Sequence, residues 1–136
     1  MTNTIGSTGR IDEATIVADR YTSIWNQPDA LLRRQAVADL WVEDGVEYVE
    51  GARFEGLDEL DTRIAHAYNE FVDSGRYRVT HAGDTGRHHD IVSFTIQLIT
   101  IDTDEIAWAA RVFLLLDADG RIREDYQLTI RPLAAA

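Results

Sequence analysis

Hydrophobic residues follow two different spacings along the chain, and the change between them divides the sequence into two halves. In residues 11–26, 28–41 and 57–75, apolar side chains recur every three or four positions, which is typical of amphipathic helices. Gly75 ends the third of these segments, as glycine often does at the end of a helix. The predicted apolar stripes are Ile11, Ala14, Val17, Ala18, Tyr21 and Trp25; Leu32, Ala36, Leu40 and Trp41; and Leu57, Leu60, Ile64, Tyr68 and Phe71.

A period of two replaces the helical spacing after Gly75 and predicts strands. The segments "GDTGRHHD", "DTDE" and "DADG" separate these strands as turns. A shorter strand is expected at residues 44–51, between the second and third helices, and residues 52–56 form a turn or another short strand. The four long strands are predicted at residues 77–82, 90–101, 106–116 and 122–130.

Helices followed by a meander of strands indicate an α+β domain. Three amphipathic helices must then pack on one face of a curved antiparallel sheet, and such a cone favours a pocket inside. We expect a single domain over residues 11–133 and a mobile segment at residues 1–10.

Composition and charge narrow the possible functions. The 136 residues include 24 acidic and 13 basic side chains, for a formal net charge of −11, so we expect no nucleic-acid partner and no membrane partner. The chain has neither cysteine nor lysine, which excludes thiolate and Schiff-base chemistry. No apolar run approaches the ~20 residues of a membrane span, and no signal peptide is recognisable, so we expect a cytoplasmic protein. Phosphate loops and dinucleotide fingerprints are missing, and we expect no cofactor.

Several short segments resemble a known family. They are "RYTSIWN" in the first helix, "LWVEDGVEYVEG" at the first strand, "FEGLDEL" before the third helix, "HHDIVSF", and "DADGRI" before the last strand. Together with the order of elements, they are similar to the NTF2-like fold, and in particular to its SnoaL-like branch of small bacterial proteins. The similarity covers roughly residues 11–131. It implies the fold, but the family includes isomerases, polyketide cyclases, epoxide hydrolases, dehydratases and pockets without chemistry.

The resemblance also indicates which acids are missing. In many relatives the first strand ends in an Asp-Pro pair, and the Asp is the general base of ketosteroid isomerases. Those two positions fall on Val49 and Glu50 here, and the second pocket acid of the isomerases falls near Val112. Their oxyanion-hole tyrosine does have a match, Tyr21. The Arg and Asp set of epoxide hydrolases is missing as well.

Strand alternation nominates other polar groups for the pocket. Glu47 shares a face with Val49 and is expected to point inward, whereas Glu50 points outward. A carboxylate in an apolar cup has a raised pKa, which suits a general acid or base near neutral pH. The predicted catalytic residues are Asp125, Glu47, Tyr21 and His81, and the predicted substrate-binding residues are Gln127, Trp108, Tyr68, Trp25, Phe94, Val49, Val112 and Thr129.

His88 and His89 stand next to Asp90 and suggest a metal site at first sight. Successive residues of a strand or turn point apart, so the two rings cannot easily share one ion. We interpret this segment as a structural turn and expect no metal.

Two functions remain open. The first is a cofactor-independent isomerase, cyclase or dehydratase that acts on a hydrophobic carbonyl or polyene molecule by acid-base catalysis. The second is a non-catalytic ligand-binding or structural protein, since both isomerase acids are missing. An interior filled by Trp108, Phe94 and Tyr68 would favour the second function, and open space beside Asp125 would favour the first.

The outward face of the sheet is expected to be apolar. A patch of this kind is large for a monomer to expose, so we expect a homodimer through this face. Its predicted members are Phe113, Leu115, Tyr126, Leu128 and Ile130.

Overall fold

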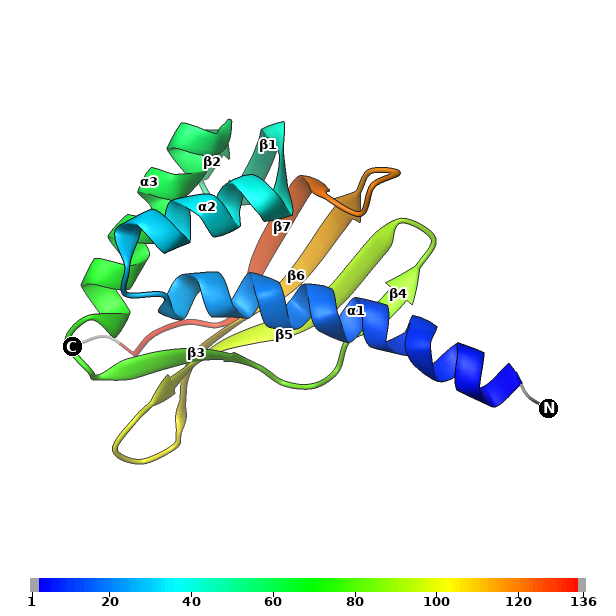
Figure 1. Cartoon of the computed structure of the whole chain (residues 1–136). Helices are drawn as coiled ribbons and strands as arrows, with labels where there is room; N and C mark the ends of the chain where they lie inside the picture. The colour runs from blue at the N-terminus through cyan, green and yellow to red at the C-terminus, as the bar shows by residue number, and fades with distance from the viewer. Residues whose placement is uncertain (1–2, 135–136) are drawn as a thin grey trace.

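The computed structural model describes the backbone of residues 3–134 and the side chains of residues 13–134. Helix α1, Asn3–Asn26, lies across one face of a curved sheet, and two further helices lie on the same side (Figure 1). The helix begins before the predicted start at residue 11, and the mobility expected for residues 1–10 stays a prediction. The later elements are α2 (Ala30–Leu40), β1 (Trp41–Val49), β2 (Ala52–Glu55), α3 (Leu57–Ala67), the π-helical turn η1 (Tyr68–Val72), β3 (Tyr77–His81), β4 (Gly86–His88), β5 (Ile91–Thr100), β6 (Ile106–Leu116) and β7 (Ile122–Arg131).

The strands form one sheet in the order β2-β1-β7-β6-β5-β3, with β4 paired to β5. The α+β architecture with three helices on a curved sheet is therefore confirmed, and the sheet is mixed, because one pair of strands is parallel among the predicted antiparallel ones. Strands β1 and β7 are parallel, with Glu47 opposite Asp125. No hairpin joins these two strands, so nothing forces them to run in opposite directions. Residues 86–88, predicted as part of a turn, form the short strand β4.

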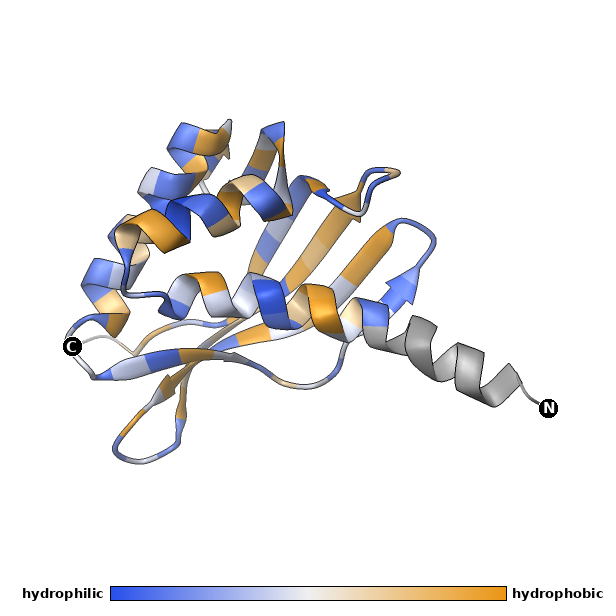
Figure 2. Cartoon of the chain, in the orientation of Figure 1, coloured by the Kyte–Doolittle hydropathy of each residue, from blue (hydrophilic) through white to orange (hydrophobic). Residues whose placement is uncertain are grey.

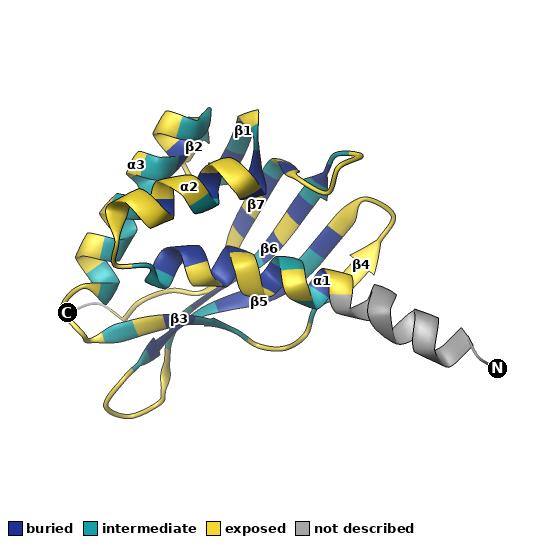
Figure 3. Ribbon diagram, viewed as in Figure 1, coloured by how far each residue is buried: buried dark blue, intermediate teal, exposed yellow. Residues whose placement is uncertain are grey.

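Burial follows the alternation of the strands. Figure 2 shows that β5 and β6 are apolar over most of their length, and Figure 3 shows buried and exposed positions alternating along the sheet. The predicted inward residues Ala110, Val112 and Leu114 of β6 are fully buried. From α1, Ala18 and Tyr21 are fully buried as predicted, so the core lies between this helix and the concave face of the sheet.

The apolar stripe of α2 differs from the prediction by one position. Arg33, Val37 and Leu40 are buried, whereas Leu32 is 51% exposed. The Arg33 guanidinium can be buried because Nη1 donates to the carbonyl oxygen of Gln27 at 2.6 Å. A polar residue with such a partner can occupy an interior position that apolar periodicity assigns to a neighbour.

Two local features position the elements around the site. Asn26, the last residue of α1, donates to the Val79 carbonyl and accepts from the Val79 amide, both at 2.8 Å, which ties the helix to edge strand β3. Gly45 is buried in β1, and a Cβ there would lie 2.8 Å from Trp41 Cδ1. The register of β1 shifts between Trp41 and Val46, so this glycine allows a bulge just before Glu47.

No helix within residues 3–134 combines the length and the apolar character needed to cross a membrane.

Candidate functional site

Two carboxylates lie next to each other in the interior. Glu47 of β1 and Asp125 of β7 are register partners across the parallel strand pair, and their exposed fractions are 1% and 0%. Two buried acids cannot both be charged at low cost, so one of them must be neutral or the pair must be compensated by a cation.

Tyr21 and Gln127 connect the two acids. The Tyr21 hydroxyl donates to Asp125 Oδ2 at 2.6 Å and lies 3.3 Å from Glu47 Oε2. Gln127 Nε2 donates to the Tyr21 hydroxyl at 2.7 Å and to Glu47 Oε2 at 3.1 Å. The opposite amide orientation would set an oxygen against a carboxylate oxygen, so the network itself decides which way the amide points.

Arg63 of α3 compensates the charge of Glu47. Its Nε donates to Glu47 Oε1 at 2.9 Å, and its side chain is 23% exposed. The guanidinium also lies 5.2 Å from the ring of Trp25 and 5.3 Å from the ring of Phe54. These aromatic faces favour a cation and hold the plane of the guanidinium beside the acid.

Burial raises the pKa of the Asp125 carboxyl well above its usual range, and the nearby Glu47 carboxylate raises that pKa further. Burial also raises the pKa of Tyr21, and so does the nearby Glu47 carboxylate. The phenol therefore keeps its proton and remains a donor. Asp125 Oδ1 has no hydrogen-bond partner among the described residues, which further favours the neutral acid. The arrangement thus favours one ion pair, Arg63 with Glu47, and a protonated carboxyl at Asp125.

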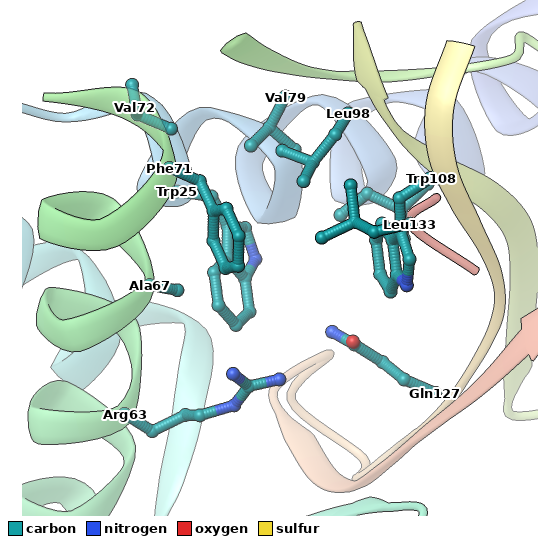
Figure 4. Close-up of a pocket in the computed structure, with 11 residues that line it drawn as sticks. Trp25, Arg63, Ala67, Phe71, Val72, Val79, Leu98, Trp108, Gln127 and Leu133 are labelled. Atoms are coloured by element: carbon teal, nitrogen blue, oxygen red, sulfur yellow. The ribbon is translucent and has the colours of Figure 1, made fainter. Parts of the chain in front are cut away.

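A cavity of about 220 Å³ opens beside this cluster. In Figure 4, Phe71 and Trp25 lie on one side, Trp108 and Leu133 lie on the opposite side, and Arg63 and Gln127 point toward each other across one end. The walls are mainly apolar, and these two side chains provide the polar groups, which is the usual composition of a small-molecule site. The lining residues are Trp25, Arg63, Ala67, Phe71, Val72, Val79, Ile96, Leu98, Trp108, Gln127 and Leu133.

Both polar residues retain unused hydrogen-bonding capacity on the cavity side. Gln127 uses both amide hydrogens within the cluster, so its Oε1 remains free to accept. Arg63 uses Nε for Glu47, and its Nη atoms have no hydrogen-bond partner among residues 13–134. A ligand oxygen can therefore accept from Arg63, and a ligand hydroxyl can donate to Gln127.

The structure brings together three of the four predicted catalytic residues, Asp125, Glu47 and Tyr21. The fourth, His81, lies elsewhere: its Nε2 is 2.6 Å from Asp19 Oδ1, and its Nδ1 accepts from the Gly83 amide at 3.1 Å. Both ring nitrogens are occupied, so His81 serves to tie β3 to α1. His81 is therefore outside the carboxylate cluster and the cavity lining, contrary to the predicted grouping of the four residues.

Of the predicted substrate-binding residues, Trp25, Trp108 and Gln127 line the cavity. Phe94 and Val112 are fully buried in the core, with the Phe94 ring against Tyr21. These aromatics do not fill the interior, so the filled pocket that would have favoured the non-catalytic alternative is not observed.

The other three predicted binding residues also lie outside the cavity lining. Tyr68 contacts the guanidinium of Arg33, 5.0 Å from its ring centroid. Thr129 donates through its amide and its hydroxyl to Glu50, whose outward position is confirmed. Val49 is half-buried at the end of β1. The inward position of Glu47 is confirmed by its burial.

Sequence reasoning missed Arg63, which is the cation of the site. Arg63, Ala67 and Phe71 follow each other at intervals of four and form one stripe along α3 and η1. The predicted stripe with Leu60 and Ile64 is buried one position away, against the core. Phe71, predicted on the same stripe as Leu60 and Ile64, instead lines the cavity with Arg63 and Ala67. It was the available signal, because helical residues four and eight positions apart lie near the same face.

His88 and His89 lie next to each other at the end of β4. Their rings meet edge to face, with centroids 4.5 Å apart, and His89 has a positive φ of 57° at the turn after β4. Within the part of the chain that the structure describes, no three acidic or histidine side chains are grouped so that they could hold a metal ion.

Comparison with known proteins identifies the fold. A candidate isomerase of the SnoaL-like family from Agrobacterium tumefaciens superposes with a TM-score of 0.77 at 24% identity, covering 86% of this chain and 97% of its own. A candidate polyketide cyclase from Sinorhizobium meliloti gives a TM-score of 0.61 at 14% identity, with 82% and 92% coverage. A SnoaL-like protein of unknown function from Burkholderia thailandensis gives 0.65 at 12% identity, with 86% and 93% coverage.

The sequence matches no family model and no curated protein. The superpositions show that the chain has the NTF2-like fold that its sequence motifs predicted, and the fold by itself does not define a reaction.

Proposed function

We propose that this protein is a cofactor-independent isomerase, cyclase or dehydratase that acts on a small apolar carbonyl compound by acid-base catalysis. The observation that carries the proposal is the buried Glu47 and Asp125 pair, connected through Arg63 and Gln127 to an apolar cavity. A structural core has little reason to retain two acids at this cost.

The geometry suggests a role for each group. Arg63 donates from Nη to the carbonyl oxygen of the substrate and stabilises the negative charge that develops there. Glu47 is the base that takes a proton from the carbon next to that carbonyl, and it returns this proton to another carbon or to a leaving hydroxyl. Asp125 stays protonated throughout. Glu47 is therefore the one charged acid of the pair until it takes the proton of the substrate.

Gln127 and Tyr21 act on the two acids. Tyr21 is absent from the cavity lining, so the oxyanion role suggested by its sequence match passes to Arg63. Tyr21 instead orients Asp125, and Gln127 orients Glu47. Glu47 is only 1% exposed, so a side-chain movement at the polar end of the cavity must precede proton transfer.

Hydrogen exchange at carbon tests this proposal directly. Small ketones incubated with the protein in D₂O should exchange protons next to their carbonyl group, as followed by ¹H NMR. A variant with both Glu47→Gln and Asp125→Asn should lose this exchange, whereas Glu55→Gln, at an exposed acid paired with Arg53, should retain it. Full exchange in the double variant would contradict the assigned chemistry.

The second candidate function is binding without catalysis, and the sealing of both acids from the cavity favours it. In that case ketones would bind with measurable affinity, and no exchange would occur with the unmodified protein.

A further inference from the structure

Two apolar side chains separate the cavity from a larger depression on the outside. Phe71 and Leu133 line the cavity of about 220 Å³, and they also line a neighbouring groove of about 930 Å³. The groove continues over Tyr77 and Ile106. A ligand that enters from this groove must pass between Phe71 and Leu133.

The two residues are held in place very differently. Phe71 belongs to η1, and the Asp73 amide closes this turn by donating to the Tyr68 carbonyl at 2.9 Å. The Phe71 ring packs on the Tyr77 ring, with the two centroids 6.4 Å apart. Leu133 follows the end of β7, and in Figure 1 this segment runs toward η1. Within the described residues, no main-chain hydrogen bond holds positions 132–134.

Leu133 is thus the movable part of this partition. Its side chain is 38% exposed, and the preceding Pro132 has no amide hydrogen to donate. Segments with few buried contacts and few backbone hydrogen bonds open at low free-energy cost. The rigid side is Phe71, and the side that can swing away is Leu133.

The cavity volume limits which ligands fit while Leu133 is closed. An apolar cavity of about 150 Å³ holds benzene, and pockets for drug-sized molecules begin at about 300 Å³. A space of about 220 Å³ therefore accommodates one ring with a short substituent. Glu47 already balances the charge of Arg63, so a neutral ligand oxygen suits this end better than an anion.

We propose that Leu133 sets the ligand size of this site: its closed position admits neutral one-ring ketones and excludes ketones with two fused rings. The proposal rests on the proposed function only for the choice of a carbonyl compound as ligand. Phe71 supplies the fixed opposite wall of the entrance.

Two probes with the same acetyl group test the size limit. Acetophenone has one ring and 2-acetylnaphthalene has two, and calorimetry gives their affinities for the unmodified protein, Leu133→Ala and Leu31→Ala. Leu31 is 68% exposed on α2 and is the matched control. Leu133→Ala should bind 2-acetylnaphthalene at least about tenfold more tightly than the unmodified protein, with acetophenone changing less than about threefold. Equal affinity of all three proteins for the two-ring ketone would overturn the proposal.

A second measurement needs no ligand and separates this inference from the proposed function. Trp25 and Trp108 line the cavity, and acrylamide that enters it quenches their fluorescence. Leu133→Ala should show at least about twice the quenching constant of both the unmodified protein and Leu31→Ala. If neither ketone binds, the ligand class in the proposed function is wrong, and stronger quenching in Leu133→Ala still supports the proposal that Leu133 limits access to the cavity. Unchanged quenching would then overturn that proposal as well.

Discussion

Tyr21 donates a hydrogen bond of 2.6 Å to Asp125 Oδ2 across 104 positions of sequence. This bond joins α1 to β7 in the centre of the core, where both residues are fully buried. Gln127 donates to the same hydroxyl, so Tyr21 is a donor to one partner and an acceptor from the other. Loss of this one oxygen atom would leave Asp125 Oδ2 and one of the two Gln127 amide hydrogens without a partner.

Tyr21→Phe should therefore lower the free energy of unfolding by about 1–3 kcal/mol, the usual cost of leaving buried polar groups unsatisfied. Urea denaturation gives this value. Tyr77→Phe is the matched control, because Tyr77 is half-buried in the outer groove and its hydroxyl has no hydrogen-bond partner among residues 13–134. The control should stay within about 0.5 kcal/mol of the unmodified protein. Equal effects in the two variants would mean that the buried network contributes no stability.

The raised pKa of Asp125 predicts how stability depends on pH. Above a pH of about 3.9, the usual pKa of an aspartate, the unfolded chain has lost the proton that the folded chain still holds. The folded state then binds more protons, so the free energy of unfolding falls as pH rises toward the folded pKa, by up to about 1.4 kcal/mol per pH unit. Asp125→Asn removes this contribution because the amide is neutral at every pH.

Urea denaturation between pH 4 and pH 8 measures this effect. The stability of Asp125→Asn relative to the unmodified protein should rise steadily with pH. Asp102→Asn, at an exposed position in the β5–β6 turn, should show the same pH dependence of stability as the unmodified protein. If Asp125→Asn also showed that same pH dependence, Asp125 would be charged in the folded state.

Arg63→Met should destabilise the protein because it leaves the charge of Glu47 buried without its cation. Fully buried pairs cost about 3–5 kcal/mol when one partner is removed, and the partial exposure of Arg63 lowers our expectation to about 2–3 kcal/mol. Adding Glu47→Gln should restore most of the loss, since the remaining group is neutral. A double-mutant cycle by urea denaturation measures this coupling.

A second double-mutant cycle, with Arg53→Met and Glu55→Gln, provides the comparison. Arg53 pairs with Glu55 on the surface, where both side chains are more than half exposed, and an ion pair of this kind contributes about 0–1 kcal/mol. A coupling between Arg63 and Glu47 no larger than that of the surface pair would contradict the compensating role of Arg63.

We propose that two copies of this chain pair through the outer face of the sheet. Leu128 and Ile130 are 51% and 61% exposed there, and Phe113 and Tyr126 are also exposed, as their outward position predicted. Leu128→Asp should turn a dimer into a monomer, because a charge in an apolar interface is costly to desolvate. Sedimentation velocity at micromolar concentration measures both proteins, and Leu31→Asp on α2 is the control. A monomeric unmodified protein would refute the proposal.

Helical and strand periodicity in the sequence was sufficient to predict the three helices, the long strands and the inward direction of Glu47. These are local properties: apolar spacing decides which face of a helix or strand is buried, and a one-residue error reverses the face. Local patterns failed where a polar residue replaced an apolar one in the interior. Arg33 on α2 and Arg63 on α3 are examples, because arginine is assigned to the surface unless its partners are known.

Motifs and periodicity in the sequence were enough to predict the NTF2-like fold and a set of inward polar residues that contained Glu47, Asp125, Tyr21 and Gln127. The contact between these four side chains could be seen only in the folded protein, because it depends on the parallel pairing of β1 and β7 between residues far apart in the chain. The same holds for the separation of His81 from them and for the position of Leu133 in the cavity lining. Periodicity indicates the face on which a side chain lies, whereas distances between elements are set by how the whole chain packs.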